Sequence, residues 1–140
     1  MKAFQIMTRE VVFVGMDDPL GKVKEIFDRH HFHHLLVVEN GKLRGVISDR
    51  DLLRALSPYI GTAAETTRDA ATLNKRAHQI MSRRPVTIHE HDSVQRAVEL
   101  FSEHEISCLP VLGSERKPIG IVSWRDILRL FASSGHPSRP

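Results

Sequence analysis

The sequence predicts an α/β fold built from two copies of one βαββα unit, in the order strand, helix, strand, strand, helix. The first observation behind this prediction is that the chain repeats itself at a nearly constant offset. The second is that each copy alternates short β-branched runs with apolar residues at helical spacing. The third is that residues 45–51 (GVISDRD) return as residues 120–126 (GIVSWRD), where a strand leads directly into a helix.

The repeat can be followed residue by residue. Residues 6–9 (IMTR) recur as residues 80–83 (IMSR), and the offset of 74 residues holds through the pair 32–38 and 106–112. It becomes 75 at Gly45 and Gly120, because the second turn is one residue longer, as is typical of a structural repeat. We therefore expect a first repeat at 1–57, a linker with a helix at 58–79, a second repeat at 80–132 and a flexible tail at 133–140.

Each copy opens with a β-branched run, expected as a strand at 11–14 and at 86–88. The helix that follows is predicted to be capped by Asp18, with Pro19 at its first position. In the second copy we expect Asp92 as the cap, with Gln95 completing a capping box.

A hairpin and a helix complete each copy. The first hairpin joins residues 35–38 to 43–47 through Asn40-Gly41, a strong hairpin signal. The second runs from 109 to 122 through a turn at 113–116. Closing helices are expected at 52–56 and 127–131, and a further helix at 68–79 in the linker.

Composition and termini point to an ordinary globular protein. The chain has 140 residues, 41% hydrophobic and 26% charged, which is enough for one core or two small half-domains. No apolar run approaches the roughly 20 residues that a membrane span needs, and the start lacks a secretory h-region. The single cysteine, Cys108, excludes an internal disulfide. We expect a cytoplasmic protein without a membrane partner.

The charge pattern disfavours nucleic acid as a partner. The net charge is +3, with 20 basic and 17 acidic residues interspersed. Much of the surplus lies at Arg68, Lys75, Arg76, Arg83 and Arg84, without an aromatic-rich platform beside it. A mildly basic solvated surface explains this pattern.

Two serine–aspartate pairs are the principal candidate site residues. Ser48 and Ser123 stand at expected helix N-caps, and Asp51 and Asp126 stand at the third helical position, so the simple interpretation is two capping boxes. The functional interpretation is that a helix N-terminus with a hydroxyl and a carboxylate holds a ribose phosphate. Duplication of the whole motif favours the second interpretation, and the residues alone leave both open.

These motifs resemble a known family. Two copies of I-M-[TS]-R, an apolar strand, a D-capped helix, an h-x-x-L-[LP]-V strand and G-[VI]-[IV]-S-x-R-D together resemble a tandem cystathionine-β-synthase (CBS) domain pair. The resemblance covers residues 1–132, apart from the middle of the linker. Its specificity comes from the recurrence of all these features in the same order and spacing in both halves.

The resemblance implies two repeats packed sheet to sheet about a pseudo-two-fold axis, with two symmetry-related clefts. Such pairs are commonly regulatory modules that bind adenosine compounds: AMP, ADP, ATP, NAD or S-adenosylmethionine. No cofactor is required, and two pairs typically form a homodimer. The implied ligand contacts are ribose to Asp51 or Asp126, phosphate to Ser48 or Ser123, and adenine near Val11 and Val12 in one cleft and near Pro85 and Val86 in the other.

The two copies depart from the family pattern in different ways. Leu36 stands where the pattern has proline, which the second copy keeps as Pro110. Some members place a cationic side chain just before this strand, to reach phosphate. The first copy has His33 and His34 there, whereas the second has Ser107 and Cys108, so we expect inequivalent sites. The histidines either contact a phosphate, in a cleft that the sequence does not identify, or are solvated or capping residues. Arg50 and Arg125 either reach phosphate or pair with carboxylates.

The sequence disfavours metal binding and catalysis. Residues 30–34 (HHFHH) enter a strand, where alternate side chains point to opposite faces, and no cysteine or carboxylate lies in register to complete a metal site. Ser48 and Ser123 lack a G-x-S-x-G elbow, and Cys108, expected to be buried, has no base beside it. We therefore expect no enzyme activity.

The sequence thus predicts a stand-alone regulatory module. It senses an adenosine nucleotide in the clefts between the two repeats and signals to a partner protein by a change of conformation. The alternative is a structural dimerisation or interaction module without a nucleotide ligand, in which the motif serines and aspartates only cap helices. The sequence names neither the particular adenosine compound nor the regulated partner.

Overall fold

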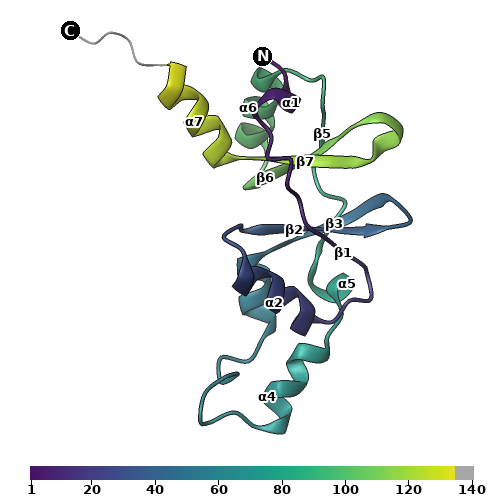
Figure 1. The fold of residues 1–140 in the computed structure, drawn as a ribbon, viewed down its shortest axis with the longest axis vertical. Helices are drawn as coiled ribbons and strands as arrows, with labels where there is room; N and C mark the ends of the chain where they lie inside the picture. Colours follow the sequence, from purple (N-terminus) through teal and green to yellow (C-terminus); the bar gives the residue numbers. More distant parts are fainter. Residues whose placement is uncertain (135–140) are drawn as a thin grey trace, which may run out of the picture. The chain divides into compact units, whose positions relative to one another are not determined.

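Residues 1–134 are described by a computed structural model, in which the chain forms two compact units (Figure 1). Unit 2 is formed by residues 12–84, and unit 1 by residues 1–11 together with the described residues from 85 onward. Each unit holds one small mixed sheet with helices, so the predicted α/β class is confirmed.

Unit 2 contains a four-stranded sheet in the order β1-β2-β3-β4, in which β1 is parallel to β2 and the other pairs are antiparallel. Its elements are β1 (Phe13–Val14), α2 (Leu20–Arg29), β2 (His34–Glu39), β3 (Lys42–Ser48), α3 (Asp49–Ala55), α4 (Thr67–Ala71), the 3-10 turn η1 (Thr72–Asn74), α5 (Ala77–Ile80) and β4 (Ser82–Arg83). The first strand is thus shorter than the predicted run 11–14.

Unit 1 contains a three-stranded sheet in the order β5-β6-β7. Its elements are α1 (Ala3–Ile6), β5 (Ile88–His89), α6 (Val94–Glu103), β6 (Cys108–Leu112), the 3-10 turn η2 (Ser114–Arg116), β7 (Pro118–Ser123) and α7 (Trp124–Ser134). An isolated bridge from Thr8 to Ile121 occupies the place that β4 takes beside β3 in unit 2.

Each unit combines the leading segment of one repeat with the sheet of the other. In unit 1, α1 lies beside α6 and β7 (Figure 1), and Ala3 and Met7 are buried in the core with Leu109 and Val122 of the second repeat. In unit 2, Ala77 and Met81 are likewise buried with β2 and β3 of the first repeat. The sequence repeats at 1–57 and 80–132 therefore do not coincide with the compact units, because each unit takes its leading segment from the other repeat.

A repeated glycine marks the place where each leading segment crosses its sheet. A Cβ on Gly45 would lie 2.6 Å from Met81 Sδ and 2.7 Å from Ser82 O. A Cβ on Gly120 would lie 2.5 Å from Met7 Sδ. Such distances leave no room for a side chain, so glycine is required at both positions by close packing rather than by backbone conformation.

The two hairpins set the register of the site residues. Asn40 (φ 53°) and Gly41 (φ 77°) are both left-handed, as a two-residue type I′ turn requires, which confirms the predicted first hairpin. A bulge then shifts the register between Val37 and Val38, and the second hairpin has one between Val111 and Leu112. Beyond the bulges, His34 stands opposite Ser48, and Cys108 stands opposite Ser123.

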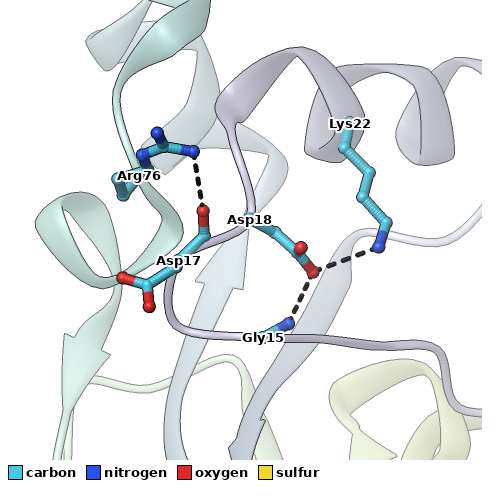
Figure 2. Close-up of polar contacts among 5 residues, drawn as sticks. All are labelled: Gly15, Asp17, Asp18, Lys22 and Arg76. Carbon is cyan, nitrogen blue, oxygen red and sulfur yellow. Dashed lines mark hydrogen bonds and ion pairs between the residues drawn. The ribbon is translucent and has the colours of Figure 1, made fainter.

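The predicted cap of the first long helix was wrong by one residue. Pro19, not Asp18, is the N-cap of α2. The Asp18 carboxylate instead turns back, where Oδ2 accepts hydrogen bonds from Gly15 N at 2.7 Å and from Lys22 Nζ at 3.2 Å (Figure 2). The hydrogen bond from Gly15 holds the pKa of Asp18 below its ordinary value. The aspartate therefore fixes the turn that precedes the helix.

The same correction applies to the second copy. Ser93 is the N-cap of α6, where its Oγ accepts a hydrogen bond from Arg96 N at 3.1 Å. Asp92 accepts a hydrogen bond from His89 N at 2.9 Å, three residues back, as Asp18 does from Gly15. The capping box predicted between Asp92 and Gln95 is therefore absent.

The linker helix predicted over 68–79 is broken into α4, η1 and α5. Lys75 and Arg76 are extended between them, because this stretch pairs with the loop before α2. Lys75 O accepts a hydrogen bond from Leu20 N at 2.8 Å, and Arg76 Nη1 donates to Asp17 O at 3.0 Å (Figure 2). These contacts within unit 2 replace the hydrogen bonds that a continuous helix would have made.

The last helix is longer than the predicted 127–131. It begins at Trp124 and ends at Ser134, so the first two residues of the tail predicted at 133–140 are helical. Residues 135–140 lie outside the described residues. Within the described part of the chain, no helix is long and apolar enough to cross a bilayer.

Candidate functional sites at the two serine–aspartate boxes

The box in unit 2 lies where β3 runs into α3. Ser48 is the N-cap of α3, and its Oγ accepts a hydrogen bond from Asp51 N at 3.0 Å. Asp51 Oδ2 accepts one in return from Ser48 N at 2.9 Å. Sequence alone predicted this capping box, and the structure confirms it.

The box in unit 1 repeats this geometry between β7 and α7. Asp126 Oδ2 accepts hydrogen bonds from Ser123 N at 2.8 Å and from Ser123 Oγ at 3.1 Å. Asp126 is only 7% exposed and is the single buried charged side chain among the described residues, whereas Asp51 is half-buried. Asp126 Oδ1 lies 3.9 Å from Arg129 Nη1 on the next turn.

Capping does not use up either carboxylate. An ionised carboxylate has two oxygens and about four acceptor positions. The caps engage Oδ2 in both boxes, so Oδ1 keeps acceptor positions for a donor such as a sugar hydroxyl. The structural and the functional interpretations of Asp51 and Asp126 are therefore compatible in this geometry.

Histidines stand beside the first box. His34 and Ser48 face each other across the β2–β3 ladder, which places their side chains on the same side of the sheet. His33 Nδ1 lies 2.8 Å from Asp49 Oδ2, and Asp49 N donates to His33 O at 3.0 Å. The hairpin thus joins the two predicted histidines to the first turn of α3.

Burial and neighbouring charges at this corner shift the pKa values of His34 and Asp49. Burial lowers the pKa of the His34 imidazole, and the opposing effect of Asp49 does not cancel it. Partial burial acts to raise the pKa of Asp49, but the hydrogen bond and positive charge of His33 outweigh it, so this pKa lies below its ordinary value. His34 is therefore neutral near pH 7, while Asp49 is charged.

The equivalent corner of unit 1 is apolar and aromatic. Cys108 takes the place of His34 opposite Ser123, and Trp124 takes the place of Asp49. The Trp124 ring packs against Phe101 with ring centroids 5.2 Å apart. Cys108 is buried, as predicted, and burial raises the pKa of its thiol to about 12. The two boxes thus differ chemically, as the sequence predicted.

The remaining predicted residues lie around these boxes or at the unit boundaries. Arg50 and Arg125 are exposed in the first turns of α3 and α7, and their contacts with phosphate or with carboxylates stay predictions. The predicted adenine contacts are all half-buried and fall where the chain passes between units, at 11/12 and just after 84/85. These residues are Val11, Val12, Pro85 and Val86. Their contacts with a ligand stay predictions.

A metal site has no support in this geometry. Among the described residues, no group of three or more histidine, cysteine, aspartate or glutamate side chains could hold a metal ion. His30 instead stacks on Phe32, with ring centroids 5.1 Å apart.

Sequence reasoning missed Asp49 and Phe101 as neighbours of the boxes. The signal for Asp49 was present, because a hairpin centred on Asn40-Gly41 returns to the level of His33 at residues 48–49. Phe101 lies two residues before the end of α6, and no pattern in the sequence linked it to Trp124.

Two α/β repeats, each with one serine–aspartate box at the start of its last helix, make up a tandem domain pair. The chain belongs to the CBS domain family, whose pattern matches residues 3–58 and 77–133. The resemblance stated from the sequence is thereby confirmed over nearly the whole chain.

The relatives include a protein of similar size and domain pairs solved with ligands. A CBS domain-containing protein of Dictyostelium discoideum is 32% identical over 138 residues, which cover 97% of this chain and 94% of that protein. The CBS domain pair of protein MJ0100, solved with 5′-methylthioadenosine and S-adenosyl-L-methionine, is 27% identical with a TM-score of 0.77, covering 95% of this chain and 97% of that one.

More distant comparisons support the fold. CBSX2, solved in complex with AMP, is 21% identical with a TM-score of 0.76, covering 94% of this chain and 96% of that one. Several other curated relatives are longer, and this chain spans 45%, 22% and 21% of three of them. The CBS pair therefore occurs both alone and as a part of larger proteins.

Proposed function

We propose that this chain is a non-catalytic regulatory module that binds an adenosine compound at its serine–aspartate boxes and signals occupancy to a partner protein. The observation that carries the proposal is the repeated box, in which Asp51 and Asp126 each use Oδ2 for the cap and keep Oδ1 as an acceptor for ribose hydroxyls. Membership of the CBS family supports it, as do the adenosine ligands of MJ0100.

The candidate ligands are AMP, ADP, ATP, NAD and S-adenosylmethionine, which share the ribose that the aspartates would hold. Phosphate groups are expected at the first box, where His33, His34 and Arg50 supply donors. The aromatic corner at Trp124 and Cys108 suits a ligand with fewer charges. Signalling follows from population shift, since a ligand that binds one arrangement of the chain more tightly increases the population of that arrangement.

Thermal unfolding with and without ligand tests this function. At 100 times its dissociation constant, a ligand of the native state adds about 2.7 kcal/mol to the free energy of unfolding, and we expect such a rise with at least one of the five compounds. GTP is the matched control for ATP, because it has the same sugar and phosphates with another base. The proposal would be contradicted if none of the adenosine compounds raises the unfolding temperature.

A structural module without a ligand is the second candidate, and the confirmed capping boxes are the observation that favours it. In that case the serines and aspartates stabilise helices only. Both candidates predict a partner surface, and α7 offers one: Trp124, Leu128 and Phe131, at helical spacing, are 49%, 61% and 63% exposed. Leu53, the counterpart of Leu128 in the first repeat, is 73% exposed.

We propose that this apolar stripe pairs two copies of the chain as a homodimer. Replacing Leu128 with glutamate places a charge in the stripe, and we expect the dimer dissociation constant to rise at least tenfold. Sedimentation equilibrium measures this change. Ser102→Glu is the control, because it adds the same charge at an exposed position of α6. Equal dissociation constants for wild type and Leu128→Glu would exclude the stripe as the interface.

A further inference from the structure

We propose that His34 makes ligand binding at the first box depend on pH, so that a phosphate-bearing ligand binds more tightly as the solution becomes more acidic. This inference rests on the proposed function, because it concerns the same site. The inference adds a regulatory property to the proposed function: occupancy of the first box would depend on pH as well as on the nucleotide concentration. The second box has no equivalent of this residue.

The geometry places His34 at the box itself. It is the first residue of β2 and stands directly opposite Ser48, the N-cap residue whose Oγ and N bond to Asp51. Facing residues of an antiparallel pair have Cβ atoms about 5 Å apart. An imidazole there is within reach of any phosphate that contacts the Ser48 hydroxyl.

Burial keeps His34 neutral until an anion arrives. Charged groups act on it from the residue before β2 and from α3: Asp49 and Asp51 favour the protonated ring, whereas His33 and Arg50 oppose it. Burial outweighs them and lowers the pKa of His34 below its ordinary value. A phosphate would add negative charge beside the ring and raise that pKa, so binding would take up a proton.

The neighbouring His33 is a less suitable carrier of this effect. Its side chain and that of Asp49, 2.8 Å away, are 57% and 41% exposed, so solvent screens the charge of this pair. In the second repeat the position of His34 is held by Cys108, whose pKa of about 12 keeps it protonated throughout the neutral range. The pH dependence should therefore belong to the first box alone.

Calorimetric titration with AMP in two buffers of different ionisation enthalpy measures the protons taken up on binding. We expect uptake by wild type near pH 7, and an affinity that rises by at most about tenfold per pH unit as the pH falls toward the ordinary pKa of histidine. Titration with adenosine, which lacks the phosphate, should show no uptake. The phosphate's own ionisation near pH 6 acts in the opposite direction and is the same for all variants.

Two replacements identify the responsible ring. His34→Cys installs the residue that the second repeat already holds at the equivalent position, and His34→Asn is a second variant that keeps a polar side chain. Both should bind AMP with no proton uptake, whereas His33→Asn should retain it.

The outcomes separate this inference from the function on which it rests. AMP binding with equal proton uptake in wild type and both His34 variants would overturn the role of His34 while leaving the sensor intact. Loss of proton uptake in His33→Asn alone would assign the pH dependence to His33 and would also overturn the role of His34. An absence of binding heat with AMP and with every other adenosine compound would overturn both.

Discussion

Alanine at Gly45 or Gly120 is expected to lower the free energy of unfolding by about 3 kcal/mol. The added methyl group would meet Met81 Sδ at 2.6 Å in the first case and Met7 Sδ at 2.5 Å in the second. Backbone carbonyls lie almost as close, at Ser82 and Thr8, so moving the methionine alone does not relieve the contact. The leading segment must therefore shift from its sheet. Urea unfolding followed by circular dichroism measures the loss.

Gly21→Ala is the matched control for these variants. Gly21 lies within α2, where a Cβ would find its nearest neighbours at 3.7 and 3.8 Å, an ordinary van der Waals distance. Since alanine is the better helix former, this variant should gain up to about 1 kcal/mol. If Gly45→Ala and Gly120→Ala unfold at the wild-type urea concentration, the leading segments do not pack against the sheets as described.

Alanine at Asp51 or Asp126 is expected to weaken nucleotide binding at its own box by about 10- to 100-fold. This is the range that corresponds to losing hydrogen bonds to a charged group. The chain has one tryptophan, Trp124, beside the second box, so its fluorescence distinguishes the sites. Asp126→Ala should remove the fluorescence response of Trp124 to ligand. Asp51→Ala should leave that response unchanged and remove the heat of ligand binding at the first box.

Both aspartate variants also lose the carboxylate half of a capping box, which costs up to about 1 kcal/mol of stability by itself. Ser93→Ala separates the two effects, because Ser93 caps α6 through a 3.1 Å hydrogen bond to Arg96 and belongs to neither box. It should lose similar stability and bind nucleotide as wild type does. A binding loss in Ser93→Ala equal to that in the aspartate variants would attribute the effect to general destabilisation.

Local chemistry was the part of the structure that sequence predicted well. The boxes at Ser48 and Ser123 were predictable because a capping box depends on residues only three apart. The turn at Asn40-Gly41 was predictable because few other residues accept positive φ at two successive positions. The caps at Asp18 and Asp92 were misplaced because an aspartate bonds as readily to a donor three residues back as to a helix end.

Long-range packing was not predictable. The repeat aligns residues 6–9 with 80–83 but does not say which sheet each segment joins, and the structure exchanges them. The break in the linker helix has the same origin, since Lys75 O accepts a hydrogen bond from Leu20 N, 55 positions earlier in the chain. The bulge before Gly45 also escaped sequence reading, and it alone places His34 rather than His33 opposite Ser48.

Calorimetric titration of wild type and of the double variant Asp51→Ala plus Asp126→Ala tests the central claim most directly. AMP and S-adenosylmethionine are the two ligands to compare, because one carries a phosphate and the other does not. We expect wild type to bind at least one of them and the double variant to bind neither, while both proteins give the same far-ultraviolet circular dichroism. A double variant that binds as tightly as wild type would show that the repeated carboxylates do not hold the ligand.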